Sequence, residues 1–318
     1  MPVLSVVIPT FNAARFLPAA IESALHNSPA IGEVEVIVVD DGSTDETAAV
    51  LEGYRDRICA YVLPHCGMPS KVRNYGLERA SAEVIAFLDA DDECLPGRFE
   101  RGLQLLDHSG AGLAFCDWKL DDGSGSLQPT FFEKTGALSF LRHALCEGAI
   151  EDCFGLLIRH GSFIGGGSMM IRKAAIQQVG LFDATLRIGE DYELATRLAS
   201  AFRVAVDFTP GILRRVHGGN LSQDWAKRWP DELALDLLLL ERPAVCSRPE
   251  LHKALRRRTA QVCRGRGSWH LSQGDVLRAR RYWRQGMALE PFSASTLFAV
   301  LSFLPVASLR WLQTWKAQ

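Results

Sequence analysis

Apolar runs alternate with polar, helix-like stretches over the first third of this chain. Continuous runs of Val, Ile and Leu predict strands, and each is followed by residues with the spacing of an amphipathic helix. The predicted strands are residues 4–8, 34–39, 60–63 and 84–88, and the predicted helices are residues 16–25, 44–54 and 72–80. Repeated strand–helix units of this kind indicate a mostly parallel sheet with helices on both faces.

The pattern changes in the second half of the chain. Residues 121–126 predict a turn, and residues 154–167 predict a glycine-rich connection. The last part is helical throughout, with predicted helices in residues 233–240, 251–262 and 269–289. We therefore expect an α/β domain over residues 1–225 and a helical appendage over residues 226–318.

Composition narrows the class of protein. The chain has 318 residues, of which 47% are hydrophobic and 23% charged, so it is long and apolar enough to fold around a sizeable core. Its formal net charge of -2 gives no general attraction to nucleic acid, and no nucleic-acid partner is expected. Residues 1–9 lack the basic start of a signal peptide. The eight cysteines form no C-x-x-C pair, which favours a reduced, cytoplasmic protein without a zinc site.

Polar residues gather where the predicted strands end, which is where open α/β sheets bind ligands. The three strand ends read Thr10-Phe11-Asn12, Asp40-Asp41 and Asp89-Ala90-Asp91-Asp92. A single Asp or Asn in such a place could simply cap a helix. Three carboxylates within four residues repel one another, however, and a divalent cation such as Mg²⁺ or Mn²⁺ would neutralise them. Because no glycine-rich phosphate loop accompanies these strands, such a metal would also neutralise phosphate.

Five segments together resemble the family 2 glycosyltransferases. They are residues 4–12 (LSVVIPTFN), 38–44 (VVDDGST), 73–77 (RNYGL), 87–92 (FLDADD), and 180–183 (GLFD) followed by 189–191 (GED). Their order and spacing match that family over residues 3–222. The resemblance implies the GT-A fold, which is an α/β nucleotide-diphospho-sugar transferase fold. It also implies transfer of a sugar, with inversion, from a nucleoside diphosphate donor.

The resemblance also implies a role for individual residues. Thr10, Phe11 and Asn12 would bind the donor beside the nucleoside, and Asp40 and Asp41 would bind it at the base. Asp89 would contact the ribose or a metal-bound water, and Arg73 with Asn74 would lie along the donor. Asp91 would bind the metal, Mn²⁺ or Mg²⁺. The alternative for Arg73 and Asn74 is a surface position at the start of a helix, and Phe11 could be a core aromatic.

Two acidic residues and one histidine in the later half complete the expected site. In the resembled family the Asp of the GED motif is the catalytic base, so Asp191 is expected to take the proton of the acceptor hydroxyl while Glu190 binds or orients the acceptor. The alternative is that the two acids precede a predicted helix, residues 192–198, and favour its dipole. His217 lies in a segment that resembles the end of the family's catalytic domain, and it is expected near the metal.

The chain lacks the Gln-x-x-Arg-Trp motif of the processive members of that family, so addition of a single sugar is expected. A sugar-nucleotide-binding subunit without catalysis is one alternative function. A nucleotidyltransferase is another, but it should carry a lysine-rich loop near its N-terminus, where Lys71 is the only lysine before Asp89. A saccharide or lipid-linked acceptor, as in surface-polysaccharide synthesis, would suit the resemblance.

The appendage carries two further features. Residues 269–291 are similar to one tetratricopeptide-like helical hairpin, and ten basic residues concentrate charge between residues 253 and 284. Residues 297–312 are apolar but too short to span a bilayer, so they are expected either to pack internally or to lie in a membrane interface. A cytoplasmic protein, held peripherally on the inner face of the membrane, would follow from the second choice.

Overall fold

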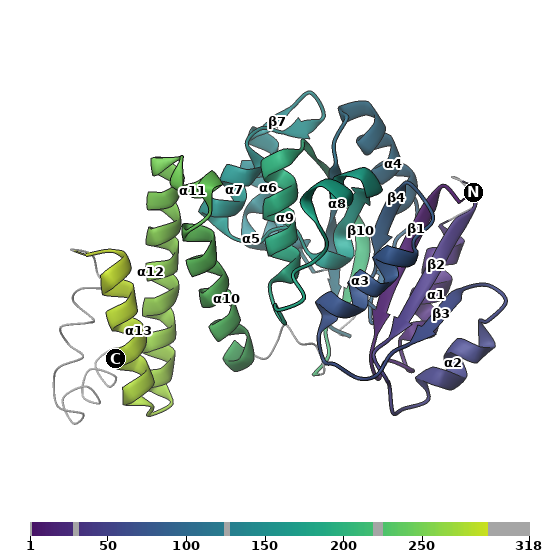
Figure 1. The fold of residues 1–318 in the computed structure, drawn as a ribbon, viewed down its shortest axis with the longest axis horizontal. Helices are drawn as coiled ribbons and strands as arrows, with labels where there is room; N and C mark the ends of the chain where they lie inside the picture. Colours follow the sequence, from purple (N-terminus) through teal and green to yellow (C-terminus); the bar gives the residue numbers. More distant parts are fainter. Residues whose placement is uncertain (1, 28–31, 124–127, 219–224, 292–318) are drawn as a thin grey trace. The chain divides into compact units, whose positions relative to one another are not determined.

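The computed structural model describes residues 2–27, 32–123, 128–218 and 225–291 (Figure 1). The chain divides into two compact units. The first contains residues 1–157 and 161–223, and the second contains residues 158–160 and 224–318. Residues 297–312, for which we expect a membrane-interface or packed helix, lie outside the described part of the chain, as do residues 219–222 of the segment that follows His217.

The first unit is built on one ten-stranded sheet with the order β3-β2-β1-β4-β9-β6-β10-β8-β7, in which β5 pairs with β10. The strands are β1 (Leu4–Thr10), β2 (Val34–Asp40), β3 (Cys59–Val62), β4 (Val84–Phe87), β5 (Glu93–Cys94), β6 (Leu113–Asp121), β7 (Leu145–Cys146), β8 (Ala149–Ile150), β9 (Met169–Arg172) and β10 (Val204–Arg215). Strands β1 to β4 are mutually parallel, as the strand–helix pattern predicts.

Helices connect the strands on both faces of the sheet (Figure 1). They are α1 (Leu17–His26), α2 (Thr47–Gly53), α3 (Pro69–Arg79), α4 (Arg98–Ser109), α5 (Phe131–Thr135), α6 (Ala137–His143), α7 (Cys153–His160), α8 (Lys173–Val179) and α9 (Glu190–Ala201), with a short 3-10 turn, η1 (Gly166–Ser168), before β9. The first three helices lie within a few residues of their predicted positions.

The core explains why the predicted strands form. Val36, Ile37, Val38 and Val39 of β2 are all at most 2% exposed, because a parallel sheet between helix layers buries both sides of its central strands. The register of β1 with β2 pairs Thr10 with Asp40, so the polar ends of the two strands lie side by side. The carboxyl ends of the strands therefore form one polar edge, as expected.

Strand β9 is the main addition to the predicted sheet. It inserts between β4 and β6 and is antiparallel to both. Since it runs backwards, its first residues lie beside the end of β4, where Met170 pairs with Ala86. The turn η1 immediately before it consequently reaches the polar edge of the sheet.

Two local predictions were wrong in detail. Residues 154–167, predicted as a glycine-rich connection, begin with a helix, α7, whose N-cap Asp152 accepts a hydrogen bond from the Gly155 amide. The glycines cluster only at its end, which is why the sequence there resembles a loop. The predicted helix of residues 192–198 begins earlier, at Glu190, because Gly189 adopts φ 85° and ends the preceding loop. The two acids therefore lie in the first turn of α9.

The second unit is helical, with α10 (Trp225–Leu240), α11 (Pro243–Cys246), α12 (Pro249–Ser272) and α13 (Val276–Leu289). Helix α12 is longer than predicted and continues through Gly265 and Gly267. Gly267 has a packing role, since a Cβ there would lie 2.2 Å from Nε1 of the buried Trp283 on α13. The predicted helix of residues 269–289 is instead divided at Gly274, which adopts φ 80° between the two helices.

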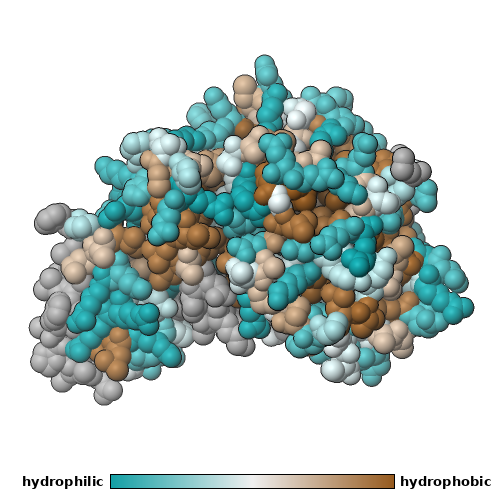
Figure 2. Space-filling view, in the orientation of Figure 1, coloured by the Kyte–Doolittle hydropathy of each residue, from teal (hydrophilic) through white to brown (hydrophobic). Residues whose placement is uncertain are grey.

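Hydrophilic side chains cover much of the visible face (Figure 2). This is expected of a folded chain whose strands are buried. All eight cysteines are free thiols. Among the helices that the structure describes, none combines the length and the apolar character needed to cross a bilayer.

Candidate active site

The first part of the site is an exposed aromatic surface beside Asp41. The ring of Phe11 stacks on His65 with 4.2 Å between centroids, and Phe11 is 44% exposed, so it is no core aromatic. Asp41 is buried, and its two carboxylate oxygens accept the amides of Cys66 and Gly67 at 2.9 and 2.8 Å. The arrangement offers a flat ring to a planar group, next to a fixed carboxylate. His65 was missed in the sequence, which shows no motif around it.

Asp40 and Asn12 hold the loops at this edge together. Asp40 is 2% exposed and accepts both the amide and the hydroxyl of Ser43. Asn12 adopts φ 49°, and its side-chain Oδ1 accepts the backbone amide of Thr44 at 2.8 Å. The backbone amide of Asn12 donates to the Ser43 hydroxyl. Both side chains thus fix the ends of β1 and β2, and their contact with a donor stays a prediction. Thr10 ends β1 beside them with a buried hydroxyl.

Arg73 links two carboxylates that are far apart in the sequence. From α3, its guanidinium donates to Glu190 Oε1 at 2.6 Å and to Asp89 Oδ1 at 2.8 Å. Arg73 and Glu190 are both buried, and burial raises the pKa of Glu190 to about 7 although Arg73 acts to lower it. Arg73 is therefore not a surface residue. It joins the end of β4 to the start of α9.

Asp191 lies close to Arg73 and against the turn η1. Its Oδ2 accepts the Gly166 amide at 3.0 Å, and its Oδ1 accepts the Tyr192 amide at 2.7 Å. The turn approaches the acids closely: a Cβ on Gly167 would lie 3.3 Å from Asp89 Oδ2, and one on Gly166 would lie 3.5 Å from Asp191 Cβ. These glycines give the carboxylates room, a role that the sequence pattern alone did not reveal.

Asp91 and His217 meet at the same edge, 126 residues apart in the chain. His217 Nε2 lies 3.1 Å from Asp91 Oδ2, and the His217 ring stacks on Phe16 at 4.6 Å. Burial raises the pKa of Asp91, and the neighbouring Asp89 raises it further, while His217 acts to lower it. A cation at this position would relieve the repulsion between the two carboxylates.

The residue types fit a divalent metal. A carboxylate oxygen and an imidazole nitrogen placed side by side are suitable ligands for Mn²⁺, and a bound diphosphate would supply further oxygens. Within the ranges that the structure describes, no group of three or more His, Cys, Asp or Glu side chains is arranged to hold a metal. The chain alone therefore offers a partial ligand set.

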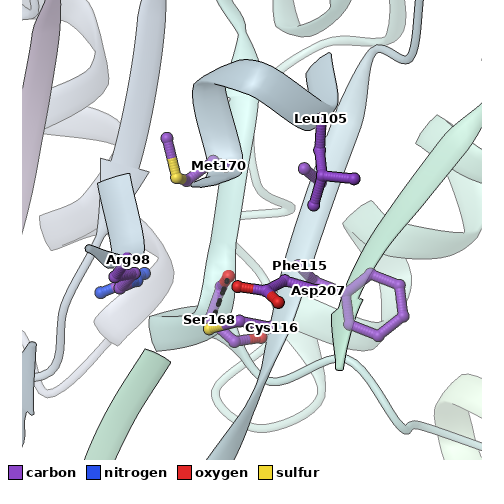
Figure 3. Close-up of a pocket in the computed structure, with 9 residues that line it drawn as sticks. Arg98, Leu105, Phe115, Cys116, Ser168, Met170 and Asp207 are labelled. Carbon is purple, nitrogen blue, oxygen red and sulfur yellow. Dashed lines mark hydrogen bonds between the residues drawn. The ribbon is translucent and has the colours of Figure 1, made fainter. Parts of the chain in front are cut away.

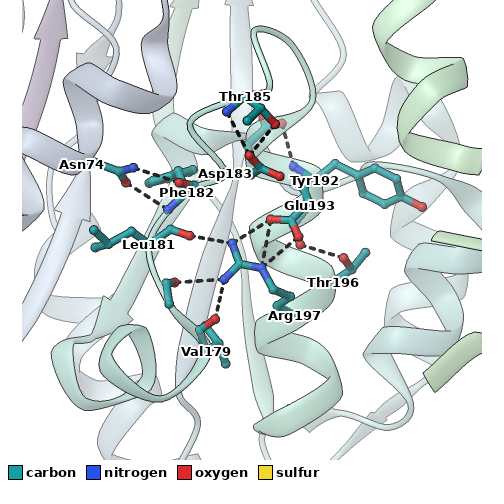
Figure 4. A network of polar contacts seen from close by, with 12 residues as sticks. Asn74, Val179, Leu181, Phe182, Asp183, Thr185, Tyr192, Glu193, Thr196 and Arg197 are labelled. Carbon is teal, nitrogen blue, oxygen red and sulfur yellow. Dashed lines mark hydrogen bonds and ion pairs between the residues drawn. The ribbon is translucent and has the colours of Figure 1, made fainter. Parts of the chain in front are cut away.

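Asn74 and Arg197 fix the loop that leads into α9 (Figure 4). The amide of Asn74 both donates to and accepts from the backbone of Phe182, at 2.8 and 2.9 Å. Arg197 pairs with Glu193 on the same helix and donates to the carbonyls of Val179 and Leu181. Asn74 thus has a structural role that explains its place beside Arg73, and its contact with the donor stays a prediction.

The family model for glycosyl transferase family 2 matches residues 5–179. Among curated relatives, the succinoglycan biosynthesis protein ExoO of Rhizobium meliloti is 32% identical over 226 residues, which cover 70% of this chain and 63% of that protein. ExoU of the same organism is 33% identical over 227 residues, covering 68% and 63%. An uncharacterized glycosyltransferase of Rickettsia typhi, RT0329, is 28% identical and covers 68% and 64%. The matches thus span just under two thirds of the length of these relatives.

Solved structures share the fold. S. aureus TarS (residues 1–349), in complex with UDP-GlcNAc, has a TM-score of 0.64 at 19% identity, covering 92% of this chain and 82% of that one. The mannosyltransferase PcManGT of Pyrobaculum calidifontis, in complex with GDP-Man and Mn²⁺, has a TM-score of 0.62 at 14% identity, covering 99% and 84%. Together with the family match, these comparisons confirm the predicted GT-A fold. The chain belongs to glycosyl transferase family 2.

Proposed function

We propose that this chain is an inverting glycosyltransferase that moves one sugar from a nucleoside diphosphate sugar to an acceptor hydroxyl. The observation that carries the proposal is the convergence of Asp89, Glu190 and Asp191 around Arg73 at the carboxyl edge of the sheet, in a chain of this family. The acids come from β4 and α9, and only the fold brings them together.

The donor base would lie on the exposed ring of Phe11, with Asp41 and the neighbouring strand ends as its polar contacts. The stacked Phe11 and His65 offer an aromatic face, and Asp41 is held rigidly by two backbone amides. The complexes of TarS with UDP-GlcNAc and of PcManGT with GDP-Man support a nucleotide-sugar donor. A UDP-sugar is our expectation for this chain.

Asp91 and His217 would hold Mn²⁺ or Mg²⁺. Bound there, the metal would neutralise the diphosphate and stabilise it as a leaving group. The adjacency of the two side chains and the raised pKa of Asp91 support this assignment. The Mn²⁺ in the PcManGT complex supports the choice of metal.

Asp191 would act as the general base. It is fixed by the Gly166 and Tyr192 amides, which hold its carboxylate in one orientation. Glu190, buried against Arg73, would orient Asp191 and the acceptor. Attack by the deprotonated hydroxyl in a single displacement inverts the anomeric carbon.

The acceptor would be a saccharide or a lipid-linked saccharide in surface-polysaccharide synthesis, which the names of ExoO and ExoU support. A cytoplasmic location with peripheral contact to the inner face of the membrane would suit such an acceptor. Helices α12 and α13 carry ten basic residues, and the apolar residues 297–312 follow them in the sequence. Basic side chains of this kind attract anionic lipid.

Two experiments test the proposal. The purified chain is incubated with Mn²⁺ and a panel of nucleotide sugars, and release of nucleoside diphosphate is followed in the absence of acceptor. Slow, metal-dependent hydrolysis of one donor is expected. Release of sugar 1-phosphate, by cleavage between the two phosphates, would instead indicate a nucleotidyltransferase, and binding without turnover would indicate a non-catalytic subunit. Cosedimentation with vesicles tests the membrane contact: binding to phosphatidylglycerol vesicles and not to phosphatidylcholine vesicles is expected.

A further inference from the structure

Arg98 is a buried cation in an unfavourable place. It is the first residue of α4, where the positive end of the helix dipole disfavours a cation, and it is only 2% exposed. In the part of the chain that the structure describes, no ion pair joins it to a carboxylate. Burying a charge without an opposite charge is costly. The contacts of the Arg98 guanidinium must therefore explain why this charge is buried.

The guanidinium joins two backbone segments. One nitrogen, Nη2, donates to the carbonyl of Phe87 at 2.8 Å and to the carbonyl of Gly167 at 2.5 Å, while Nη1 points to Cys94 Sγ at 3.1 Å. Phe87 is the last residue of β4, and Gly167 belongs to the turn η1. A planar guanidinium can satisfy several acceptors in fixed directions, which an ammonium group cannot do equally well.

Both segments carry parts of the proposed catalytic machinery. Asp89 follows Phe87 by two residues. The turn that contains Gly167 donates an amide to Asp191 and passes within van der Waals distance of Asp89. Arg98 therefore sets the separation between the segment that carries Asp89 and the turn that contacts Asp191.

The side chain of Arg98 is closely surrounded, with little free space beside it. The space beside it is a cavity of about 10 Å³, with Cys116, Ser168 and Asp207 across from Arg98 (Figure 3). That volume is roughly what a single water requires. Gly211 on β10 closes the site, since a Cβ there would lie 3.0 Å from Arg98 Cγ.

We propose that Arg98 is a positioning residue, which holds the Asp89–Asp91 segment and the turn η1 at the separation that sugar transfer requires. The inference rests on the proposed function. It predicts that loss of Arg98 lowers kcat while the affinity for the nucleotide is kept. Arg98 makes neither the base-binding surface at Phe11 and Asp41 nor the contact between Asp91 and His217. A displacement of about 1 Å between reacting groups costs on the order of 10²-fold in rate.

Arg98→Met tests this, with Arg101→Met as the matched control. Arg101 lies on the same helix and pairs with Asp207 at 2.6 Å, so its loss also removes a partly buried cation but leaves β4 and η1 untouched. Metal-dependent hydrolysis of the wild-type donor gives kcat and KM, and calorimetry with UDP and Mn²⁺ gives nucleotide affinity. Hydrogen exchange is followed in peptides that cover residues 88–92 and 165–168.

The expected result is a loss of about 10²-fold in kcat for Arg98→Met with KM and UDP affinity nearly unchanged, faster exchange in both peptides, and neither effect in Arg101→Met. Arg98→Lys, whose side chain is one bond shorter and so should hold both carbonyls less closely, should be intermediate and decides the matter if Arg98→Met does not fold. Unchanged kcat and exchange, or equal losses in the Arg101 variant, would overturn the inference. A wild-type chain that hydrolyses no donor refutes the proposed function instead, and the exchange result still tests whether Arg98 holds the two segments.

Discussion

Replacing Asp191 with Asn should separate catalysis from binding, and the structure sets the size of both effects. Each carboxylate oxygen of Asp191 accepts one backbone amide, from Tyr192 and from Gly166. An amide has only one acceptor oxygen, so one of these N–H groups would face an NH₂ group and lose its partner. An unpaired buried donor costs about 1–3 kcal/mol, which is the expected loss in the free energy of unfolding.

The loss in rate should be much larger than this change in stability can explain. A domain of ordinary stability, about 5–15 kcal/mol, remains almost wholly folded after losing a few kcal/mol. Transfer should nevertheless fall by about 10²–10⁴-fold, because the amide cannot accept the proton of the acceptor. Affinity for UDP with Mn²⁺ should stay close to that of the wild type, since the base-binding surface is elsewhere.

Urea denaturation, donor turnover and calorimetry with UDP measure these three quantities on the same variant. Asp117→Asn is the control, since Asp117 accepts the amides of Trp118 and Phe132 through one oxygen, which an amide retains. It should turn over donor at nearly the normal rate. Near-normal turnover by Asp191→Asn would refute Asp191 as the base, and loss of UDP affinity would make it a donor-site residue. A product with retained anomeric configuration would refute the single displacement altogether.

The remaining predictions concern the metal, a buried acid and the second unit. Asp91→Asn should abolish the effect of Mn²⁺ on UDP affinity, and His217→Ala should weaken it less; calorimetry that finds equal affinities with and without metal in the wild type would contradict both. Burial raises the pKa of Glu190 from 4.5 to about 7, so its protonated form stabilises the fold: this contribution is complete below about pH 4.5 and is lost as the pH rises through 7. Glu190→Gln should flatten that fall in unfolding free energy, and an unchanged pH profile would argue against the shift. Gly267→Ala should destabilise the chain by about 1–3 kcal/mol in urea, whereas Gly265→Ala on the same helix, where a Cβ meets nothing within 4 Å, should be neutral or stabilising.

The strand pattern predicted which polar residues lie together at the carboxyl edge of the first strands. Each of the first strands is a short apolar run followed by polar residues, and local sequence is enough to place Phe11, Asp41 and Asp89 at one edge once the strands are known to be parallel. The family resemblance added the distant Asp191 and His217, and the structure places the two near Asp89 and Asp91 respectively.

What the sequence did not reveal depends on contacts between distant segments. His65 matters because its ring lies on Phe11, and nothing in its own neighbourhood indicates that. In the sequence, Arg98 is an ordinary helix residue. Its role depends on partners that lie 11 and 69 residues away. The glycines of η1 are likewise explained only by the acids that they face. Side-chain packing of this kind has no periodic signature in the chain.

The antiparallel insertion of β9 has a consequence for the order in which the chain acquires its activity during synthesis. Strands β1 to β4 pair with one another as soon as residues 2–87 are available, whereas β9 must cross more than 80 residues to reach β4. Contacts that close long loops form slowly. A nascent chain released before α9 and β10 would thus possess the aromatic surface and Asp89 but neither Asp191 nor His217. On the proposed function, it would bind a nucleotide but lack the base, and sugar transfer would begin only once α9 and β10 are in place.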